Sequence, residues 1–310
     1  MGIPRVLSPK IIFLVGPTAV GKSAVAIALA RRLHAEIISC DSMQVYRRMD
    51  ILNSMPSLRE RVAVLHHRLD FLEPTRSYNV SRYRREALRC MNDIHERGKP
   101  VIFTGGTGLY VSILLDGLFT VKGIDQKYRE SLYAIAQKRG SALLHKKLRG
   151  VDPVAAGKIH PNDARRIIRA LEVYKVTGKP ISLLQGNRQG LWGKYPIRLF
   201  CLTMDREDLY RRINARVDAM FRKGVIEEVE KLRGMRLSKT ASCAIGIREV
   251  GSYLKGESDI NTVKELMKRN TRWYAKRQLT WFRKDTRISW LHIDNRETPV
   301  HIAGRIIKEL

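Results

Sequence analysis

The sequence of 310 residues is poor in cysteine. Its four cysteines, Cys40, Cys90, Cys201 and Cys243, lie far apart and form no C-x-x-C pair. This spacing excludes a cysteine-based zinc site and a disulfide framework. Any bound metal would therefore need oxygen ligands.

Long apolar runs are also missing. No stretch of 18 or more apolar residues occurs, and the opening MGIPRVLSPK lacks the apolar segment and small-residue cleavage site of an export signal. We therefore expect no membrane span and a cytoplasmic location.

Acidic residues are few for the number of basic ones. Thirty Asp and Glu face 58 Lys and Arg, which gives a net charge of +28 and a pI near 10.4. The expected partner is a polyanion. Because the basic residues lie within helices that also carry an apolar period, nucleic acid is favoured over an anionic membrane surface.

The pattern of apolar runs predicts an α/β fold. Short runs at Ile11–Val15, Glu36–Cys40 and Pro100–Thr104 each precede turn residues and are separated by helical patterns, which is typical of a parallel sheet with crossover helices. A further strand is expected at Arg198–Met204. Long basic helices should follow it, at Asp208–Phe221, Val225–Leu232 and Asn261–Lys284.

Between these strands lies a stretch with helical spacing only. Residues 125–178 contain helical patterns at Tyr128–Lys138 and Asp163–Val176, and the polar Gly186–Lys194 suits a return linker. We therefore predict a core of residues 1–124 and 188–310, interrupted by a helical insertion domain at 125–187.

A phosphate-binding motif follows the first predicted strand. The segment Gly16-Pro17-Thr18-Ala19-Val20-Gly21-Lys22-Ser23 matches G-x-x-x-x-G-K-[ST] between a strand and a helix. Backbone N–H groups and the helix N-terminus would bind phosphate oxygens, Lys22 would add a cation, and the Ser23 hydroxyl would ligate Mg²⁺. The motif predicts a P-loop NTPase-like core without naming the ligand, which could be ATP, GTP or an isoprenoid diphosphate.

Two more loops should lie at the same edge of the sheet. The second strand leads into Cys40–Tyr46, where Asp41 is suited either to chemistry or to capping a helix. The third leads into Thr104–Tyr110, where Thr107 would bind an anion or cap a helix. Together the loops predict transfer chemistry at a diphosphate ester, but they do not choose the acceptor.

Several helices combine an apolar stripe with cations. In 162–176 the stripe Ala164, Ile167, Ile168, Leu171 and Tyr174 leaves Arg165, Arg166 and Arg169 facing outward. In the last long helix, Arg269, Arg272, Lys276, Arg283 and Arg287 would form a line of cations beside Trp273, Tyr274, Trp281 and Phe282. These residues would contact phosphates and bases, unless the aromatics are core and the charges simply solvated. On the helix with Leu209, Ile213, Val217 and Met220, either Arg212 or Arg216 would reach the pocket.

The ordered motifs resemble those of the bacterial tRNA dimethylallyltransferases, also called tRNA isopentenyltransferases. The motifs are GPTAVGKS, DSMQVY, GGTGLY, HPNDARRIIRALEVYKVTGKPIS, RVDAM, AIGIRE and TRWYAKRQLTWFR, and they extend over nearly the whole chain. Two segments depart from the family pattern: ILNSMPS stands where a Gly-Thr-Lys-Pro-type segment is usual, and AIGIRE where IGYKE is usual.

The resemblance implies a donor, an acceptor and a set of roles. The phosphate loop would hold dimethylallyl diphosphate instead of ATP, with Ser23 at Mg²⁺ and Lys22 on the phosphates. Asp41 would bind N6 of the target adenine and take its proton, Thr107 would orient that amine or a diphosphate oxygen, and Arg216 would stabilise the leaving diphosphate. The expected function is transfer of the dimethylallyl group to this N6, with release of diphosphate.

The family acts on the adenosine immediately 3′ of the anticodon, adenosine 37, which is flipped into the protein. The resemblance implies a monomer that binds the anticodon stem-loop. The implied tRNA contacts are Asp41, Ser42, Met43, Gln44, Thr107, Arg129, Arg165, Arg166, Ile167, Ile168, Arg169, Lys276, Arg277, Gln278, Trp281 and Arg283.

Three other interpretations use parts of the same pattern. A P-loop kinase or ATPase acting on a nucleotide or on RNA would turn over ATP. An adenylate isopentenyltransferase would act on a free nucleotide and leave the basic helices without a partner. A non-enzymatic RNA-binding protein would leave the phosphate loop, Asp41 and Thr107 unexplained.

Overall fold

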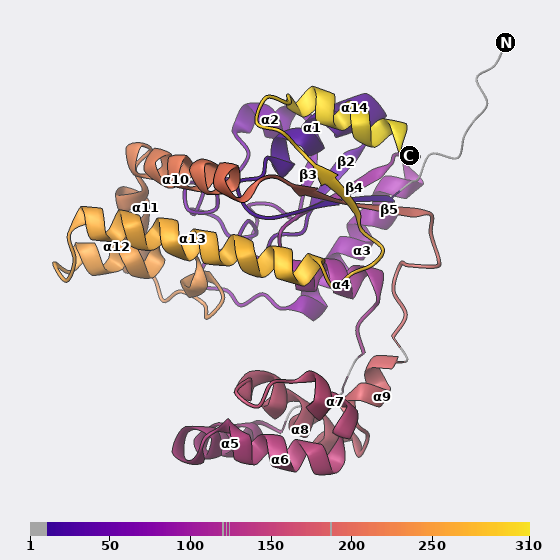
Figure 1. Ribbon diagram of the computed structural model, residues 1–310, viewed down its shortest axis with the longest axis vertical. Helices are drawn as coiled ribbons and strands as arrows, with labels where there is room; N and C mark the ends of the chain where they lie inside the picture. Colours follow the sequence, from indigo (N-terminus) through magenta and orange to yellow (C-terminus); the bar gives the residue numbers. More distant parts are fainter. Residues whose placement is uncertain (1–10, 120, 122, 124, 187) are drawn as a thin grey trace. The chain divides into compact units, whose positions relative to one another are not determined.

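The computed structural model describes residues 11–119, 121, 123, 125–186 and 188–310 (Figure 1). The chain divides into two compact units. The first, the core unit, runs up to Leu114 and resumes at Trp192; the second, the helical unit, is Leu115–Leu191. The helical unit contains the whole of the range expected for an insertion.

The core unit is built on one parallel sheet of six strands in the order β3-β2-β4-β1-β5-β6. Four of them confirm the predicted strands to within one residue at each end. The other two escaped prediction because β3 has only two residues and β6 is mostly exposed. The strands are β1 (Ile11–Val15), β2 (Glu36–Ser39), β3 (His66–His67), β4 (Val101–Gly105), β5 (Ile197–Thr203) and β6 (Ser289–His292).

The central strand β1 is buried along its entire length, as a strand covered on both faces must be. Phe13 pairs in register with Phe103 of β4, and the two rings stack 4.6 Å apart on one face. Ile12 and Leu14 point to the opposite face and join the core beneath α1.

Helices cover both faces of the sheet (Figure 1). On one side α1 (Lys22–Leu33) packs against α14 (Pro299–Lys308), and on the other lie α3 (Val80–Glu96) and α4 (Gly108–Leu115). This arrangement confirms the predicted α/β class and sets the loops after β1, β2 and β4 along one edge.

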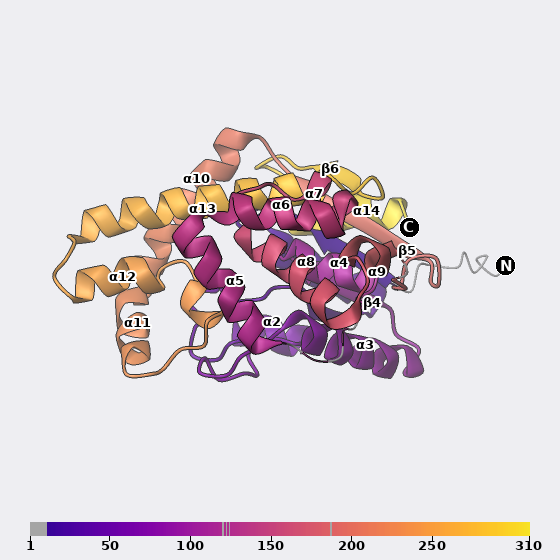
Figure 2. The same ribbon diagram turned by 90° about the horizontal axis from the view of Figure 1, so that it is seen from below.

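The rest of the core unit is helical. Helix α13 packs against α10 and α12, and α12 packs against α11 (Figure 2). The three long basic helices are confirmed, but α13 ends at Phe282, so Arg287 does not continue its line of cations; it pairs with Asp285 at 2.7 Å instead. The elements are α2 (Leu58–Ala63), α10 (Arg206–Arg222), α11 (Val225–Arg233), a 3-10 turn (Ala241–Cys243), α12 (Ile247–Leu254) and α13 (Ile260–Phe282).

The helical unit has its own apolar core, in which Ile167, Ile168 and Leu171 are buried as predicted. Tyr174 is 36% exposed, against expectation. Ten residues of helix correspond to about 1,000° of rotation, which places Tyr174 roughly 80° away from Ala164. The helices are α5 (Gln126–Arg139), α6 (Ser141–Val151), α7 (Pro153–Lys158), α8 (Ala164–Thr177) and α9 (Ile181–Gly186).

Among the helices that the structure describes, none is long and apolar enough to cross a membrane.

Candidate active site

Three loops meet at the carboxyl edge of the sheet, where ligands bind in open parallel sheets. They follow β1, β2 and β4, which are neighbours in the order β2-β4-β1. Backbone bonds join the second loop to the third: Cys40 N donates to Thr104 O at 2.7 Å, and Thr107 N donates to Cys40 O at 3.1 Å. The expected convergence of the loops is therefore present.

The first loop, residues 16–23, leads from β1 into α1. Helix α1 begins at Lys22, its N-cap residue Gly21 makes no side-chain cap, and its first turn contains no acidic residue. The first N–H groups of the helix are thus left for an external acceptor, and the helix dipole favours a negative one. This end of α1 is suited to phosphate oxygens.

Lys22 extends back over the first loop. Its Nζ donates to Pro17 O at 2.6 Å, and although the residue is partly exposed, its ammonium group is withdrawn from solvent. Burial lowers the pKa of Lys22 to about 8, against the opposing attraction of Asp41 and with the help of the nearby Arg216 charge. A bound anion would hold this lysine in its charged form.

A cavity of about 500 Å³ lies over the loop, and we call it the phosphate cavity. Both Arg212 and Arg216 of α10 line it, although the sequence predicted only one of them there. Together with Lys22 of α1, these arginines give the phosphate cavity three cationic side chains. Other lining residues include Thr18, Gly21, Ser23, Asp41, Gln44, Asn53, Thr104 and Gln278.

A second cavity of about 280 Å³, the apolar cavity, is lined mainly by hydrophobic side chains. These come from the second loop, the segment after Asp50, α10, the 241–245 segment and α13: Met43, Leu52, Val217, Met220, Ala244, Ile245 and Met267. Thr18, Asp41, Asn53 and Arg216 line both cavities. The two spaces therefore adjoin at one carboxylate and one guanidinium.

Asp41 is held at this junction by its own loop. Its Oδ1 accepts a hydrogen bond from Met43 N at 2.9 Å, in an Asx turn. No residue that the structure describes donates a hydrogen bond to Oδ2. One carboxylate oxygen thus fixes the loop and the other is left for a ligand.

Arg216 reaches the junction from α10, where Ile213 and Val217 on either side are buried in the core. Burial lowers the pKa of the Arg216 guanidinium, and the nearby Asp41 carboxylate counteracts this. An arginine remains charged even so, because its pKa starts above 12. Arg216 is placed to stabilise negative charge that develops beside Asp41.

Thr107 connects two loops. Its Oγ1 accepts from Ser42 N at 3.0 Å and lies 3.3 Å from Ser42 Oγ, and the residue lines neither of the two cavities. This position is consistent with a capping or fastening role, and contact with a substrate stays a prediction.

Five residues of the divergent segment after Asp50 line the two cavities and were not predicted to do so: Leu52, Asn53, Ser54, Met55 and Pro56. Asn53 is 8% exposed, lines both cavities and donates from Nδ2 to Met43 O at 2.8 Å. The Glu228 carboxylate supports the segment by accepting from Ile51 N at 2.9 Å and Leu52 N at 2.8 Å. Nothing in the local sequence signals this, because Glu228 lies 177 and 176 positions away from the two residues that it supports.

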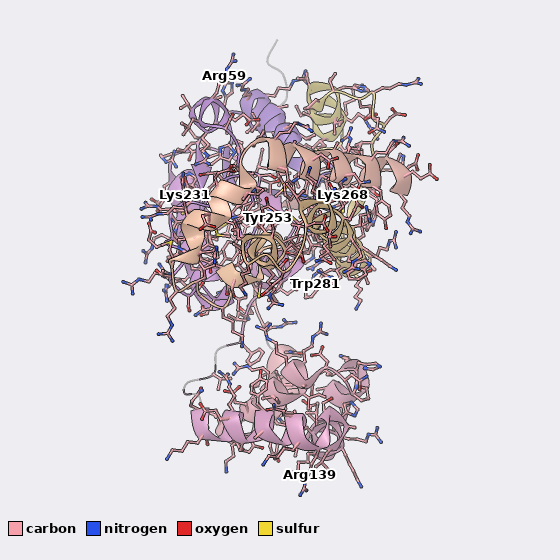
Figure 3. All side chains as sticks on the ribbon, turned by 90° about the vertical axis from the view of Figure 1, so that its left-hand side faces the viewer. Arg59, Arg139, Lys231, Tyr253, Lys268 and Trp281 are labelled. Carbon is pink, nitrogen blue, oxygen red and sulfur yellow. The ribbon has the colours of Figure 1, made fainter. Side chains whose placement is uncertain are left out.

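The residues implied as tRNA contacts in the core unit fall into three groups. Ser42, Met43 and Arg277 line the apolar cavity, and Gln44 lines the phosphate cavity. Lys276 and Trp281 are exposed on α13, as is Arg283 directly after the helix, and Trp281 is labelled in Figure 3. Gln278 differs from both groups, because its side chain is buried and bonds to the backbone of two loops. One donor and one acceptor position of its amide are therefore used within the protein, and the expected contact with tRNA stays a prediction.

In the helical unit, some of the residues implied as tRNA contacts are exposed and others are buried. Arg165 and Arg166 are exposed, whereas Ile167 and Ile168 are 0% and 1% exposed. These two isoleucines form the core of the unit, so the expected contact of their side chains with tRNA is wrong.

Arg129 and Arg169 are engaged within the same unit. Both pair with the Glu172 carboxylate, at 2.7 Å and 3.2 Å, and Glu172 is 1% exposed. A buried carboxylate needs such partners, which gives these arginines a structural role beside any contact with tRNA.

Magnesium would find oxygen ligands in the phosphate cavity. The Ser23 hydroxyl and the Asp41 carboxylate both line it, and Mg²⁺ is usually bound by one or two protein oxygens together with substrate phosphates. Within the described ranges no cluster of three or more His, Cys, Asp or Glu side chains forms an all-protein metal site. The donor set therefore fits a metal that enters with a phosphate ligand.

The chain matches two family models, "IPP transferase" over residues 44–285 and "Isopentenyl transferase" over residues 9–64. A protein of Carboxydothermus hydrogenoformans named tRNA dimethylallyltransferase is 48% identical over 98% of both chains. One of the same name from Geobacter sulfurreducens is 45% identical over 91% of both.

Solved structures agree with these similarities. The tRNA isopentenylpyrophosphate transferase of Bacillus halodurans is 40% identical, with a TM-score of 0.70 over 97% of both chains. A eukaryotic dimethylallyltransferase, described as acting on tRNA, is 30% identical, with a TM-score of 0.82 over 97% of this chain and 78% of that one.

Proposed function

The chain belongs to the IPP transferase family of tRNA dimethylallyltransferases, and from this premise we propose that it transfers a dimethylallyl group from dimethylallyl diphosphate to N6 of adenosine 37 in tRNA. Diphosphate is the second product. The observation that carries the proposal is the junction of a cationic cavity and an apolar cavity at Asp41 and Arg216.

The diphosphate group would bind in the phosphate cavity. Its oxygens would accept hydrogen bonds from the N-terminus of α1, and its charge would be balanced by Lys22, Arg212 and Arg216. Mg²⁺, held through Ser23, would supply further charge neutralisation on the phosphates. The hydrocarbon of the donor would extend toward the apolar cavity, whose walls it can contact without losing hydrogen bonds.

The reaction exchanges one bond for another at the donor's first carbon. Adenine N6 forms a bond to this carbon while the carbon–oxygen bond to diphosphate breaks, and the oxygen keeps the electron pair. The free oxygen of Asp41 takes the proton that N6 loses. Arg216 stabilises the charge gathering on the leaving oxygen, which makes it the electrostatic partner of the base.

The tRNA would be held by the exposed cations of both units. Lys276 and Arg283 of α13 and Arg165 and Arg166 of α8 suit phosphate contacts, since all four are exposed. Adenosine 37 must leave the stack of the anticodon loop to reach Asp41. The reaction would take place in the cytoplasm, where tRNA is found.

A P-loop kinase is the alternative that uses most of the same residues. It would require a γ-phosphate and a phosphoryl acceptor, and it would use the apolar cavity beside Asp41 at most for a base, not for a group to be transferred. The Cys243 and Met267 side chains in that cavity offer contact to hydrocarbon or to a base, not to a hydrated phosphate. This geometry favours transfer of an apolar group.

The test is a transfer assay with labelled dimethylallyl diphosphate, Mg²⁺ and unmodified tRNA, without ATP. We expect label in tRNA and one diphosphate released for each group transferred. Asp41→Asn should lower kcat by about 10² to 10⁴ while tRNA affinity persists, since an asparagine oxygen can still accept from Met43 N. Label on free AMP but not on tRNA, or turnover that needs ATP, would refute the proposed substrate pair.

A further inference from the structure

Gln278 is a buried polar residue near the C-terminal end of α13, with 5% of its surface exposed. Its Oε1 accepts a hydrogen bond from Thr18 N at 2.8 Å, and its Nε2 donates to Gly106 O at 3.0 Å. These partners lie 260 and 172 positions away in the sequence, in the first and third loops of the active site. One amide therefore joins the backbones of two loops that are far apart in the sequence.

The bridge depends on the chemistry of an amide. Only asparagine and glutamine offer an acceptor and a donor on one planar group, so both partners are satisfied at once. If either bond were lost, a partly or fully buried backbone group would lose its protein partner, which is costly. The orientation of the amide is thus fixed by its two partners.

Gly106 has no side chain that would collide with this amide. A Cβ atom on Gly106 would lie 2.0 Å from Gln278 Nε2, closer than two such atoms can approach. Gly106 does not have a positive φ, so close approach and not backbone conformation accounts for the glycine. The third loop and α13 therefore fit together at this one point.

The same residue lines the phosphate cavity. By fixing Thr18 N, it determines how the first loop faces that cavity, and by fixing Gly106 O it sets the distance to the opposite loop. One helical turn earlier, Tyr274 lines the apolar cavity, so α13 forms a wall common to both spaces. The helix that presents Lys276 and Arg283 on its exposed side thus contacts the diphosphate site on its buried side.

We propose that Gln278 is a positioning residue for the diphosphate: it holds the phosphate loop and the Gly105–Gly108 loop at the spacing that the diphosphate group requires. It acts through Thr18 and Gly106 and does not itself contact tRNA. The identity of the diphosphate ligand rests on the proposed function, whereas the loop spacing does not.

The test compares Gln278→Met, which keeps the size of the side chain but loses both hydrogen bonds, and Gln278→Glu, which keeps only the acceptor and adds a charge. Two lost bonds should raise KM for dimethylallyl diphosphate about tenfold or more, with tRNA affinity within about twofold of the original. Lys276→Gln, two residues away on the exposed face of the helix, serves as the matched control. It should give the opposite pattern, weaker tRNA binding with an unchanged KM for the donor.

A second variant separates positioning from helix stability. Gly106→Ala leaves α13 unaltered but displaces the amide, so it should reproduce the higher KM. Because alanine at 278 removes the clash, Gly106→Ala should add little to the effect of Gln278→Ala in the double variant. Calorimetric binding of inorganic diphosphate with Mg²⁺ gives the same comparison without the transfer reaction, so it still reports on Gln278 if the proposed donor is wrong.

The proposal is overturned if Gln278→Met binds diphosphate as well as the original protein does. It is equally overturned if the variant loses tRNA affinity and diphosphate affinity in parallel, or if only its melting temperature falls.

Discussion

Gly108 lies against the indole ring of Trp281, so close that a Cβ atom on Gly108 would come within 2.2 Å of the ring. Trp281 lies three residues beyond Gln278, and Gly108 two residues beyond Gly106, so the two contacts lie side by side between α13 and the third loop. Although Trp281 is 41% exposed, its ring packs against the third loop at Gly108. Its ring supports the loop that carries Thr107.

We therefore expect Gly108→Ala to lower both the melting temperature and transfer activity, because a rigid ring must move to admit the methyl group. Overpacking of this kind costs roughly 1–3 kcal/mol. In the double variant with Trp281→Ala the obstacle is absent, so the alanine at 108 should cost little there. Thermal unfolding of the four proteins of this cycle measures the coupling, and purely additive effects would contradict the contact.

The second prediction concerns Lys22 and the pH dependence of donor binding. Because burial brings the pKa of Lys22 in the free protein to about 8, raising the pH beyond this value removes a cation from the phosphate cavity. Diphosphate binding then requires uptake of a proton. Affinity for dimethylallyl diphosphate should therefore fall between about pH 8 and 10.

Lys22→Arg and Lys22→Met provide the controls, since neither side chain titrates in this range. Both should show a flatter pH dependence of KM, with Lys22→Met weaker throughout. The linkage also acts on stability: between about pH 8 and 10.5 the unfolded chain binds a proton at Lys22 that the native protein lacks. The original protein should gain stability relative to Lys22→Met as the pH rises through this window, and a constant difference would argue against the lowered pKa.

The features that the sequence predicted well are those formed by residues that are adjacent in the chain. The run IIFLV, the phosphate motif and a helix follow one another directly, so their geometry depends on neighbouring residues alone. Parallel pairing then brings the ends of β1, β2 and β4 together, which placed Asp41 correctly beside the phosphate loop.

Contacts between distant segments explain what was missed. Gln278 falls on the buried stripe of its helix with Ala275 and Phe282, but the sequence does not show which groups would satisfy the hydrogen bonds of a glutamine there. Glu36 begins a strand with a charged residue, yet it is 2% exposed because Arg97, Lys99 and His67 from other segments surround its carboxylate. Burial of a polar residue is decided by its partners, and those partners become known only with the fold.

The third prediction concerns Arg165, which is exposed on α8 and makes no ion pair with any residue that the structure describes. Its neighbours are less informative probes. Arg166 pairs with Asp163 at 3.1 Å, and removing Arg129 or Arg169 would leave the buried Glu172 with one partner fewer. Of these four arginines, only Arg165 is exposed and makes no ion pair within the described part of its unit.

Arg165→Gln should therefore weaken tRNA binding without lowering the melting temperature. If Arg165 contacts one phosphate, the slope of log K against log salt should become shallower by about 0.7 to 0.9, which is the counterion release expected for one cation.

Arg139→Gln, at the end of α5 in the same unit (Figure 3), removes the same charge at another exposed site. It controls for net charge alone. Equal slopes for the two variants would mean that tRNA responds to the overall +28 of the chain and not to a contact at Arg165. A slope change confined to Arg165→Gln would instead identify α8 as part of the tRNA-binding surface, because long-range attraction does not distinguish two exposed arginines of one unit.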